Sequence, residues 1–164
     1  MISGSRGNAR SRSGYLLALI TLCLIVGGLA GLVTMPSVKG WYQTLVHPSF
    51  TPPDAVFGPV WMVLYVMMAV AAWRAWGCDE YQWGSTTIRL FIIQLAFNFA
   101  WSFIFFGWHY LGVAAVEIVV LETVVIITTW TFLSRDRIAA LLMLPYIGWV
   151  GFAAVLNIGF WNLN

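Results

Sequence analysis

The stretch LGVAAVEIVVLETVVIITTWTFL, residues 111–133, decides the fold class of this chain. Its apolar residues follow one another without the alternation of a strand, and Glu117 and Glu122 are its only charged residues. A membrane core about 30 Å thick needs roughly 20 mostly apolar residues in a spanning helix. The stretch therefore predicts a transmembrane helix, and the missing alternation argues against a membrane β-barrel.

Four further apolar runs of similar length flank this one. The longest connection, residues 36–53, contains Pro36, Pro48, Pro52 and Pro53, which exclude a continuous helix there. We therefore expect an all-α membrane protein, a bundle of five transmembrane helices that occupies residues 15–164 behind a basic tail at 1–14. The helices are expected at about 15–35, 54–76, 87–107, 111–133 and 138–161.

The composition agrees with an integral membrane protein. Of the 164 residues, 61% are hydrophobic and 9% charged, whereas soluble domains carry about 25% charged residues. The net charge of +2 gives no reason to expect a nucleic-acid partner. No disulfide is predicted, because Cys23 lies in an apolar run and Cys78 in a polar connection. No metal site is predicted, because no Cys or acidic residue has ligand spacing to His47 or His109.

The basic residues indicate an orientation. With five spans, the N-terminal tail and the second and fourth links share one side of the membrane. That side holds every basic residue except Lys39: Arg6, Arg10, Arg12, Arg74, Arg89, Arg135 and Arg137. Because cytoplasmic segments carry the excess of Lys and Arg, we expect a multi-pass protein of the bacterial cell membrane with a cytoplasmic N-terminus. An organelle membrane is the alternative.

Polar residues within the spans carry the most information, because they are costly in lipid. Gln94, Asn98, Trp101 and Phe105 share one face of the third expected helix. The amides need partners, so this face should point into the bundle. Two interpretations of these amides remain: they form hydrogen bonds that only join helices, or they also contact a ligand.

Two other helices repeat this pattern with aromatic residues. One stripe contains Trp61, Tyr65, Met68 and Ala72, and the other Tyr146, Trp149, Ala153, Leu156 and Asn157. An apolar pocket with a few polar anchors is typical of small-molecule sites. Interfacial belts are the alternative for tryptophans; Trp149, in mid-span, fits that alternative poorly, and Trp61 fits both readings.

The two glutamates of residues 111–133 do not form a pair. Five residues place Glu117 and Glu122 about 140° apart around a helix, which excludes a shared acid–base site. Glu122 lies near mid-membrane, where we expect it to be protonated or paired, as a proton-handling or a structural group. Two pairs of small residues four positions apart, Gly27/Gly31 and Ala96/Ala100, allow helices to approach closely and suggest a dimer interface.

Three blocks resemble one family. They are WYxxLxxPxFxPP at 41–53 followed by FGPVWxxLY at 57–65, QLAFNxAWxxIFFG at 94–107, and LPYxxWxxFAxxLN at 144–157. Over about residues 15–162 the chain resembles the TspO/MBR family, whose members are also called translocator protein, tryptophan-rich sensory protein or peripheral benzodiazepine receptor.

The resemblance implies a five-helix bundle, often a homodimer in a lipid membrane, that binds porphyrins and benzodiazepine-type drugs such as isoquinoline carboxamides. The implied ligand is a tetrapyrrole of the porphyrin or heme-precursor type, with no required cofactor. The family's ligand-contact pattern falls on Tyr42, Trp61, Gln94, Asn98, Trp101, Trp149, Ala153 and Leu156. Glu117 falls where several members carry an acidic residue.

Two departures from the family pattern change the expectations. The cholesterol-recognition stretch of animal members expects Tyr and then Arg, but the chain reads VLNIGFW at 155–161, so tight cholesterol binding is not expected. Val113 stands where mammalian members have Trp, which should loosen one pocket wall.

The leading hypothesis is thus a tetrapyrrole- and drug-binding membrane receptor or transporter in porphyrin and stress homeostasis, and not an enzyme. A second hypothesis is an enzyme that degrades porphyrin in light, because Trp61 and Trp149 resemble a tryptophan pair implicated in that activity in some bacterial members. A third is a proton-coupled small-molecule exporter that uses Glu122.

Overall fold

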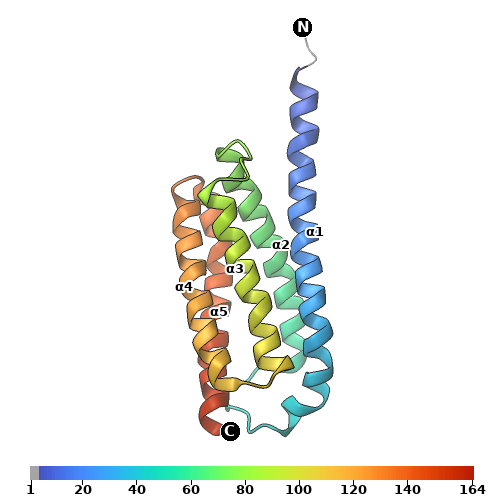
Figure 1. The fold of residues 1–164 in the computed structure, drawn as a ribbon, viewed down its shortest axis with the longest axis vertical. Coiled ribbons are helices and arrows are strands. Elements are labelled where there is room, and N and C mark those ends of the chain that lie inside the picture. Colours follow the sequence, from blue (N-terminus) through green and yellow to red (C-terminus); the bar gives the residue numbers. More distant parts are fainter. Residues whose placement is uncertain (1–3) are drawn as a thin grey trace.

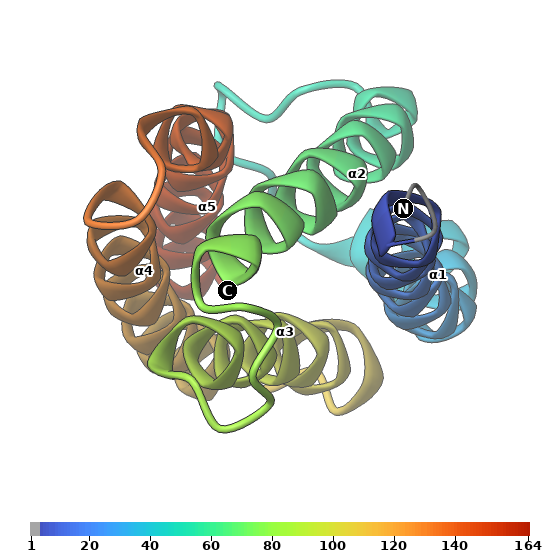
Figure 2. The ribbon, with the colours of Figure 1, turned by 90° about the horizontal axis from the view of Figure 1, so that it is seen from above.

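Five long helices run alternately up and down in the computed structural model, which describes residues 4–164, with side chains from Arg12 onward (Figure 1). Each has a segment long and apolar enough to cross a membrane, which confirms the predicted fold class. The helices are α1 (Gly4–Lys39), α2 (Asp54–Cys78), α3 (Thr86–Ser102), α4 (Leu111–Leu133) and α5 (Arg137–Leu163). Viewed from above, α1 stands on one side of the bundle, α4 and α5 on the other, and α2 and α3 between them (Figure 2).

The helix boundaries follow the expectation most closely at α4, which begins and ends where predicted. In contrast, α1 begins at Gly4, inside the expected tail, and continues through Pro36 to Lys39. The expectation that Pro36 begins the long connection was wrong, because a proline within the last turn removes only one backbone hydrogen bond. Residues 1–3 of the expected tail lie outside the described residues.

The third helix changes its winding before the turn to α4. After Ser102 the chain forms a π-helical turn, η2 (Phe103–Gly107), and His109 then adopts a positive φ of 59°. Trp108 donates its backbone N–H to the carbonyl of Phe103, which closes that turn. The short predicted link between the third and fourth helices is therefore present, with left-handed backbone at its centre.

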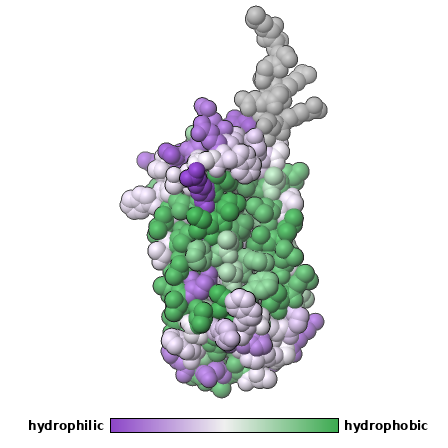
Figure 3. Space-filling model, in the orientation of Figure 1, coloured by the Kyte–Doolittle hydropathy of each residue, from purple (hydrophilic) through white to green (hydrophobic). Residues whose placement is uncertain are grey.

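The two ends of the bundle differ in charge. At one end, here called the arginine end, Arg74 pairs with Asp136 (2.8 Å) and Arg135 with Asp79 (2.9 Å). These ion pairs join the end of α2 to the link between α4 and α5. The other end, here called the loop end, carries the connection between α1 and α2. On the face seen in Figure 3 a hydrophobic belt lies between these two more polar ends.

Asp136 caps the N-terminus of α5, where its carboxylate accepts hydrogen bonds from the backbone of Ile138 (2.7 Å) and Ala139 (3.1 Å). Burial alone raises the pKa of Asp136, but the hydrogen bonds from Ala139, Arg74 and Ile138 lower it more, so the pKa lies below its ordinary value. The folded protein therefore favours the ionised carboxyl relative to the unfolded chain.

Replacing Asp136 by alanine is expected to lower the free energy of unfolding by about 0.5–2 kcal/mol, the usual effect of losing an N-cap. The contribution of Asp136 should be complete above the ordinary carboxyl pKa and should disappear as the pH falls through the lowered value. Thermal unfolding of the detergent-solubilised protein from neutral pH down to about pH 3 measures both effects. Asp136→Asn keeps a capping oxygen but loses the charge that pairs with Arg74, so it should lose the pH dependence and less stability than Asp136→Ala.

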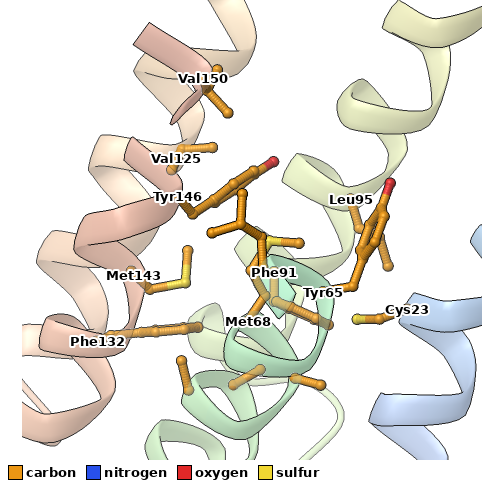
Figure 4. Packing of buried hydrophobic residues seen from close by; sticks show 14 of the residues in the cluster. Cys23, Tyr65, Met68, Phe91, Leu95, Val125, Phe132, Met143, Tyr146 and Val150 are labelled. Carbon is orange, nitrogen blue, oxygen red and sulfur yellow. The ribbon is translucent and has the colours of Figure 1, made fainter. Parts of the chain in front are cut away.

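The buried core fills the arginine-side half of the bundle. Cys23 of α1 points toward Tyr65 of α2, and Met68, Phe91 and Tyr146 pack beside them (Figure 4). Cys23, Met68, Phe91 and Tyr146 are fully buried. With Val125 and Phe132 of α4 the core joins all five helices, and it leaves the loop-end half less filled.

Gly27 lets α1 approach α2 closely. A Cβ atom at Gly27 would lie 2.5 Å from Cε2 of Tyr65, whereas a Cβ atom at Gly28 would meet nothing within 4 Å. Gly27→Ala is therefore expected to destabilise the protein by about 1–3 kcal/mol. Gly28→Ala, the matched control, should leave stability unchanged or raise it by up to about 1 kcal/mol through helix propensity. Equal melting temperatures of the two variants would contradict close packing at Gly27.

Candidate functional site

A cavity of about 790 Å³ occupies the loop-end half of the bundle. It lies between α1, α2, α3 and α5, and its lining is mostly apolar and aromatic. The structure brings together in its wall most of the residues that the sequence singled out: Tyr42, Trp61, Asn98, Trp101, Trp149, Ala153 and Leu156. Pockets of about 300–1,000 Å³ with such linings are typical of small-molecule sites.

Asn98 forms the polar centre of this wall. Tyr65 of α2 donates its hydroxyl to Oδ1 of Asn98 (2.6 Å), and Nδ2 of Asn98 donates to the hydroxyl of Tyr146 on α5 (3.2 Å). The three side chains are buried, so these hydrogen bonds join three helices where water is excluded. Asn98 thus fits both interpretations of the sequence: its amide joins helices through hydrogen bonds, and it also lines the cavity, where a ligand can contact it.

A second buried amide holds the other side of the cavity. Trp101 of α3 donates its indole N–H to Oδ1 of Asn157 (3.1 Å), and Nδ2 of Asn157 donates to the backbone carbonyl of Leu111 (2.9 Å). These contacts fix the indole of Trp101 against α5 and the start of α4. The ring is therefore held in place before any ligand arrives.

Two further tryptophans line the cavity from the neighbouring helices α2 and α5. The ring of Trp61 lies 5.7 Å from that of Tyr65 and 6.2 Å from that of Tyr146, between ring centroids. Trp149 packs edge-on against Phe57 at 5.7 Å. The Nε1 atom of Trp149 is buried and has no acceptor in the described part of the chain. This N–H therefore stays without an acceptor unless the neighbouring side chains move to admit one.

Three of the predicted polar residues do not line the cavity: Gln94, Glu117 and Glu122. Gln94 is fully buried in the core, and its Nε2 lies 3.9 Å from the sulfur of Met68. Both carboxylate oxygens of Glu117 and one of Glu122 are buried without a hydrogen-bond partner among the described residues. Proton-coupled export through Glu122 therefore gains no support from the cavity's geometry.

The sequence comparisons agree with this architecture. A model of the TspO/MBR family matches residues 19–162. The chain belongs to the TspO/MBR family. It is 36% identical over 150 residues to the tryptophan-rich protein TspO of Archaeoglobus fulgidus, covering 91% of this chain and 96% of that protein. The TspO protein of Chlorobaculum tepidum is 40% identical over 150 residues (88% and 92% covered). The human translocator protein is 35% identical over 128 residues (76% and 75% covered).

The connection between α1 and α2 covers the loop end of the cavity in this TspO/MBR protein. This outer loop, residues 40–53, begins with a short 3₁₀ helix, η1 (Trp41–Thr44). Tyr42 is buried there and lines the cavity. Gln43 donates to Asp54 (2.9 Å), and His47 lies 3.0 Å from the carbonyl of Tyr42 through Nε2. The buried ring of Tyr42 thus forms part of the cavity's end wall.

Contacts to the end of α5 hold the outer loop in place. Asn164 accepts the backbone N–H of Val46 (2.8 Å) and donates to its carbonyl (3.1 Å). Pro48 is buried, and a Cβ atom at Gly159 of α5 would lie 2.8 Å from its Cγ. The outer loop is therefore fixed at several points along its length.

The sequence analysis missed the part of the cavity wall that α1 supplies. Gly28, Gly31 and Met35 of α1 line the cavity, as do Phe106 and Phe160 from the other side. The sequence suggests close helix approach at Gly27 and Gly31, and in the structure only Gly27 serves that purpose, against Tyr65. No sequence signal separates a glycine that admits a neighbouring helix from one that leaves space for a ligand.

Proposed function

We propose that this TspO/MBR membrane protein binds tetrapyrroles, such as porphyrins and heme precursors, and benzodiazepine-type ligands in its cavity, as a receptor or transporter in porphyrin and stress homeostasis. The observation that carries the proposal is the aromatic cavity of about 790 Å³ beneath the outer loop. Its size fits a large planar ligand, and the rings of Trp61, Trp101 and Trp149 supply surfaces for stacking.

Two groups suit the polar edge of such a ligand. The buried N–H of Trp149 lacks an acceptor among the described residues. The amide of Asn98 lies in the cavity wall beside two tyrosine hydroxyls. A carbonyl or carboxylate that meets these donors would regain hydrogen bonds lost on leaving water. Family membership supports the same ligand class, and the proposal includes no cofactor.

Titration with protoporphyrin IX in the dark tests the proposal. We expect saturable quenching of tryptophan fluorescence by porphyrin in the cavity, reversed by an excess of an isoquinoline carboxamide. Trp149→Phe should reduce the quenching, whereas Trp130→Phe, a change at a residue 75% exposed on α4, should not. Quenching that never saturates, or that the competitor cannot reverse, would contradict a shared site.

Light-dependent porphyrin degradation is a second candidate function. The observation in its favour is that Trp61 and Trp149 both line the cavity, with Trp61 next to the tyrosine pair. Loss of porphyrin absorbance under light but not in the dark, abolished by Trp149→Phe with binding retained, would support this enzyme. Equal loss in light with and without the protein would exclude it.

We further propose a homodimer in the bacterial cell membrane, with the N-terminus and the arginine end in the cytoplasm. At that end Arg74 lies near the end of α2, Arg89 in the first turn of α3 and Arg135 in the link between α4 and α5, whereas Lys39 ends α1 at the loop end. An excess of arginine next to short links favours the cytoplasmic side.

The native cysteines provide a test of this orientation. Cys78 is exposed at the arginine end, and Cys23 is buried. A membrane-impermeant maleimide should label Cys78 only after the cytoplasmic face is opened, and Cys78→Ala should abolish the labelling. Ser49→Cys in the outer loop should react in intact cells. Labelling of Cys78 in intact cells would reverse the orientation.

A further inference from the structure

The cavity ends inside the bundle toward the arginine end and is covered only in part toward the loop end, where the exposed residues Lys39 and Asp54 also line it. Toward the arginine end it stops at Tyr65, beyond which the buried side chains of Cys23 and Met68 fill the space. Toward the loop end, the outer loop covers it and is held by Gln43 and by the paired hydrogen bonds between Val46 and Asn164. A ligand that passed through the outer loop would first have to break these contacts.

One side of the cavity is nevertheless open. Leu32 and Met35 of α1 and Met62 of α2 line the cavity, yet they are 70%, 61% and 63% exposed. Side chains that line a cavity and are also largely exposed mark its mouth. This mouth lies along the seam between α1 and α2, in the half nearer the loop end.

Glycines widen this seam. Gly28 and Gly31 of α1 and Gly58 of α2 line the cavity, and a Cβ atom at any of them would meet nothing within 4 Å. Closer to the arginine end the same two helices are in tight contact, because Gly27 packs against Tyr65. Most of the opening therefore lies beyond Gly27, and Leu24, one turn nearer the arginine end, also lines the cavity and is 43% exposed. Both helices have a composition that suits a membrane.

We propose that ligands enter and leave the cavity sideways from the membrane, through the seam between the loop-end halves of α1 and α2. The route suits planar, largely apolar molecules that dissolve in the bilayer. Lys39 and Asp54 also line the cavity at the loop end of this seam, where a carboxylate on the ligand could remain close to the polar surface. The inference rests on the proposed function, because it specifies how that site is reached.

Binding kinetics in lipid nanodiscs test the route, with protoporphyrin IX as the probe and tryptophan quenching in the dark as the signal. Gly31→Leu and Gly58→Leu narrow the seam from opposite sides. Each should slow association about tenfold, as for an added barrier near 1.4 kcal/mol. Both glycines also line the cavity, so the association rate, and not Kd, is the measurement that decides. The double variant Leu32→Ala/Met62→Ala should accelerate both association and dissociation.

Two controls separate the seam from other routes. Gly148→Leu, on α5, is the matched control. A Cβ atom at Gly148 also meets nothing within 4 Å, but Gly148 does not line the cavity. Its rates should equal those of the wild type. Gln43→Ala/Asn164→Ala loosens the outer loop and should also leave both rates unchanged.

Several results would overturn the proposal. Faster exchange after loosening of the outer loop would place the route at the loop end. Unchanged rates in Gly31→Leu and Gly58→Leu, or weaker affinity with unchanged association, would make these glycines ordinary parts of the wall. In all of these outcomes the wild type still binds the probe. Absence of saturable binding by the wild type would instead refute the proposed function, and this route with it.

Discussion

Replacing Asn98 by leucine is expected to weaken ligand binding and to destabilise the bundle. Leucine has a similar volume but cannot accept from Tyr65 or donate to Tyr146, so two buried hydroxyls lose a partner. The free energy of unfolding should fall by about 1–3 kcal/mol. If the amide also contacts the ligand, the dissociation constant for carbonyl- or carboxylate-bearing ligands should rise by roughly 5- to 150-fold.

A double-mutant comparison separates the two effects at Asn98. In a Tyr65→Phe/Tyr146→Phe background the structural hydrogen bonds are already absent, so any remaining loss of affinity on Asn98→Leu measures ligand contact. Titration of folded protein, together with thermal unfolding, gives both quantities. Wild-type affinity combined with a large drop in melting temperature would make Asn98 purely structural.

Ala153→Leu is expected to fill space that a ligand ring needs. Ala153 is 6% exposed and lies one helical turn from Trp149 in the cavity wall. Fitting the larger side chain beside a bound ligand should cost about 1–3 kcal/mol, or roughly 5- to 150-fold in Kd. The fold should persist, because the new side chain projects into the cavity.

Val155→Leu is the matched control for Ala153→Leu, since it enlarges a side chain of the same helix that is 58% exposed. Titrations with protoporphyrin IX and with an isoquinoline carboxamide should show normal affinity for the control and weaker affinity for Ala153→Leu. Equal affinities of two well-folded variants would remove this part of α5 from the binding site.

The sequence predicted the helices well because spanning a membrane requires a long apolar run, which leaves a strong local signal. Helix ends were less certain. Pro36 predicted the end of the first helix, yet α1 continues to Lys39 because its last turn tolerates one missing hydrogen bond. Periodicity also placed Trp101, Trp149 and Ala153 correctly on faces that meet at one cavity.

The parts that escaped prediction depend on how helices meet. Gln94 shares a helix face with Asn98 but lies one turn nearer the arginine end, where core side chains fill the bundle. Periodicity gives the face of a residue but not the depth at which a cavity ends. The contribution of Gly28 and Gly31 depends on the separation of α1 from α2, which no single helix encodes.

The two hydrogen bonds between Asn164 and Val46, which hold the outer loop against the end of α5, depend on a single side-chain amide. The side chain of Asn164 donates to the backbone carbonyls of Val46 and Phe160 through one NH₂ group. An aspartate at this position would turn a carboxylate oxygen toward both carbonyls, which it would repel, while the other oxygen could still accept the N–H of Val46. Loss of one NH₂ group would thus loosen the covering over the cavity, although neither Asn164 nor Val46 lies in the cavity wall.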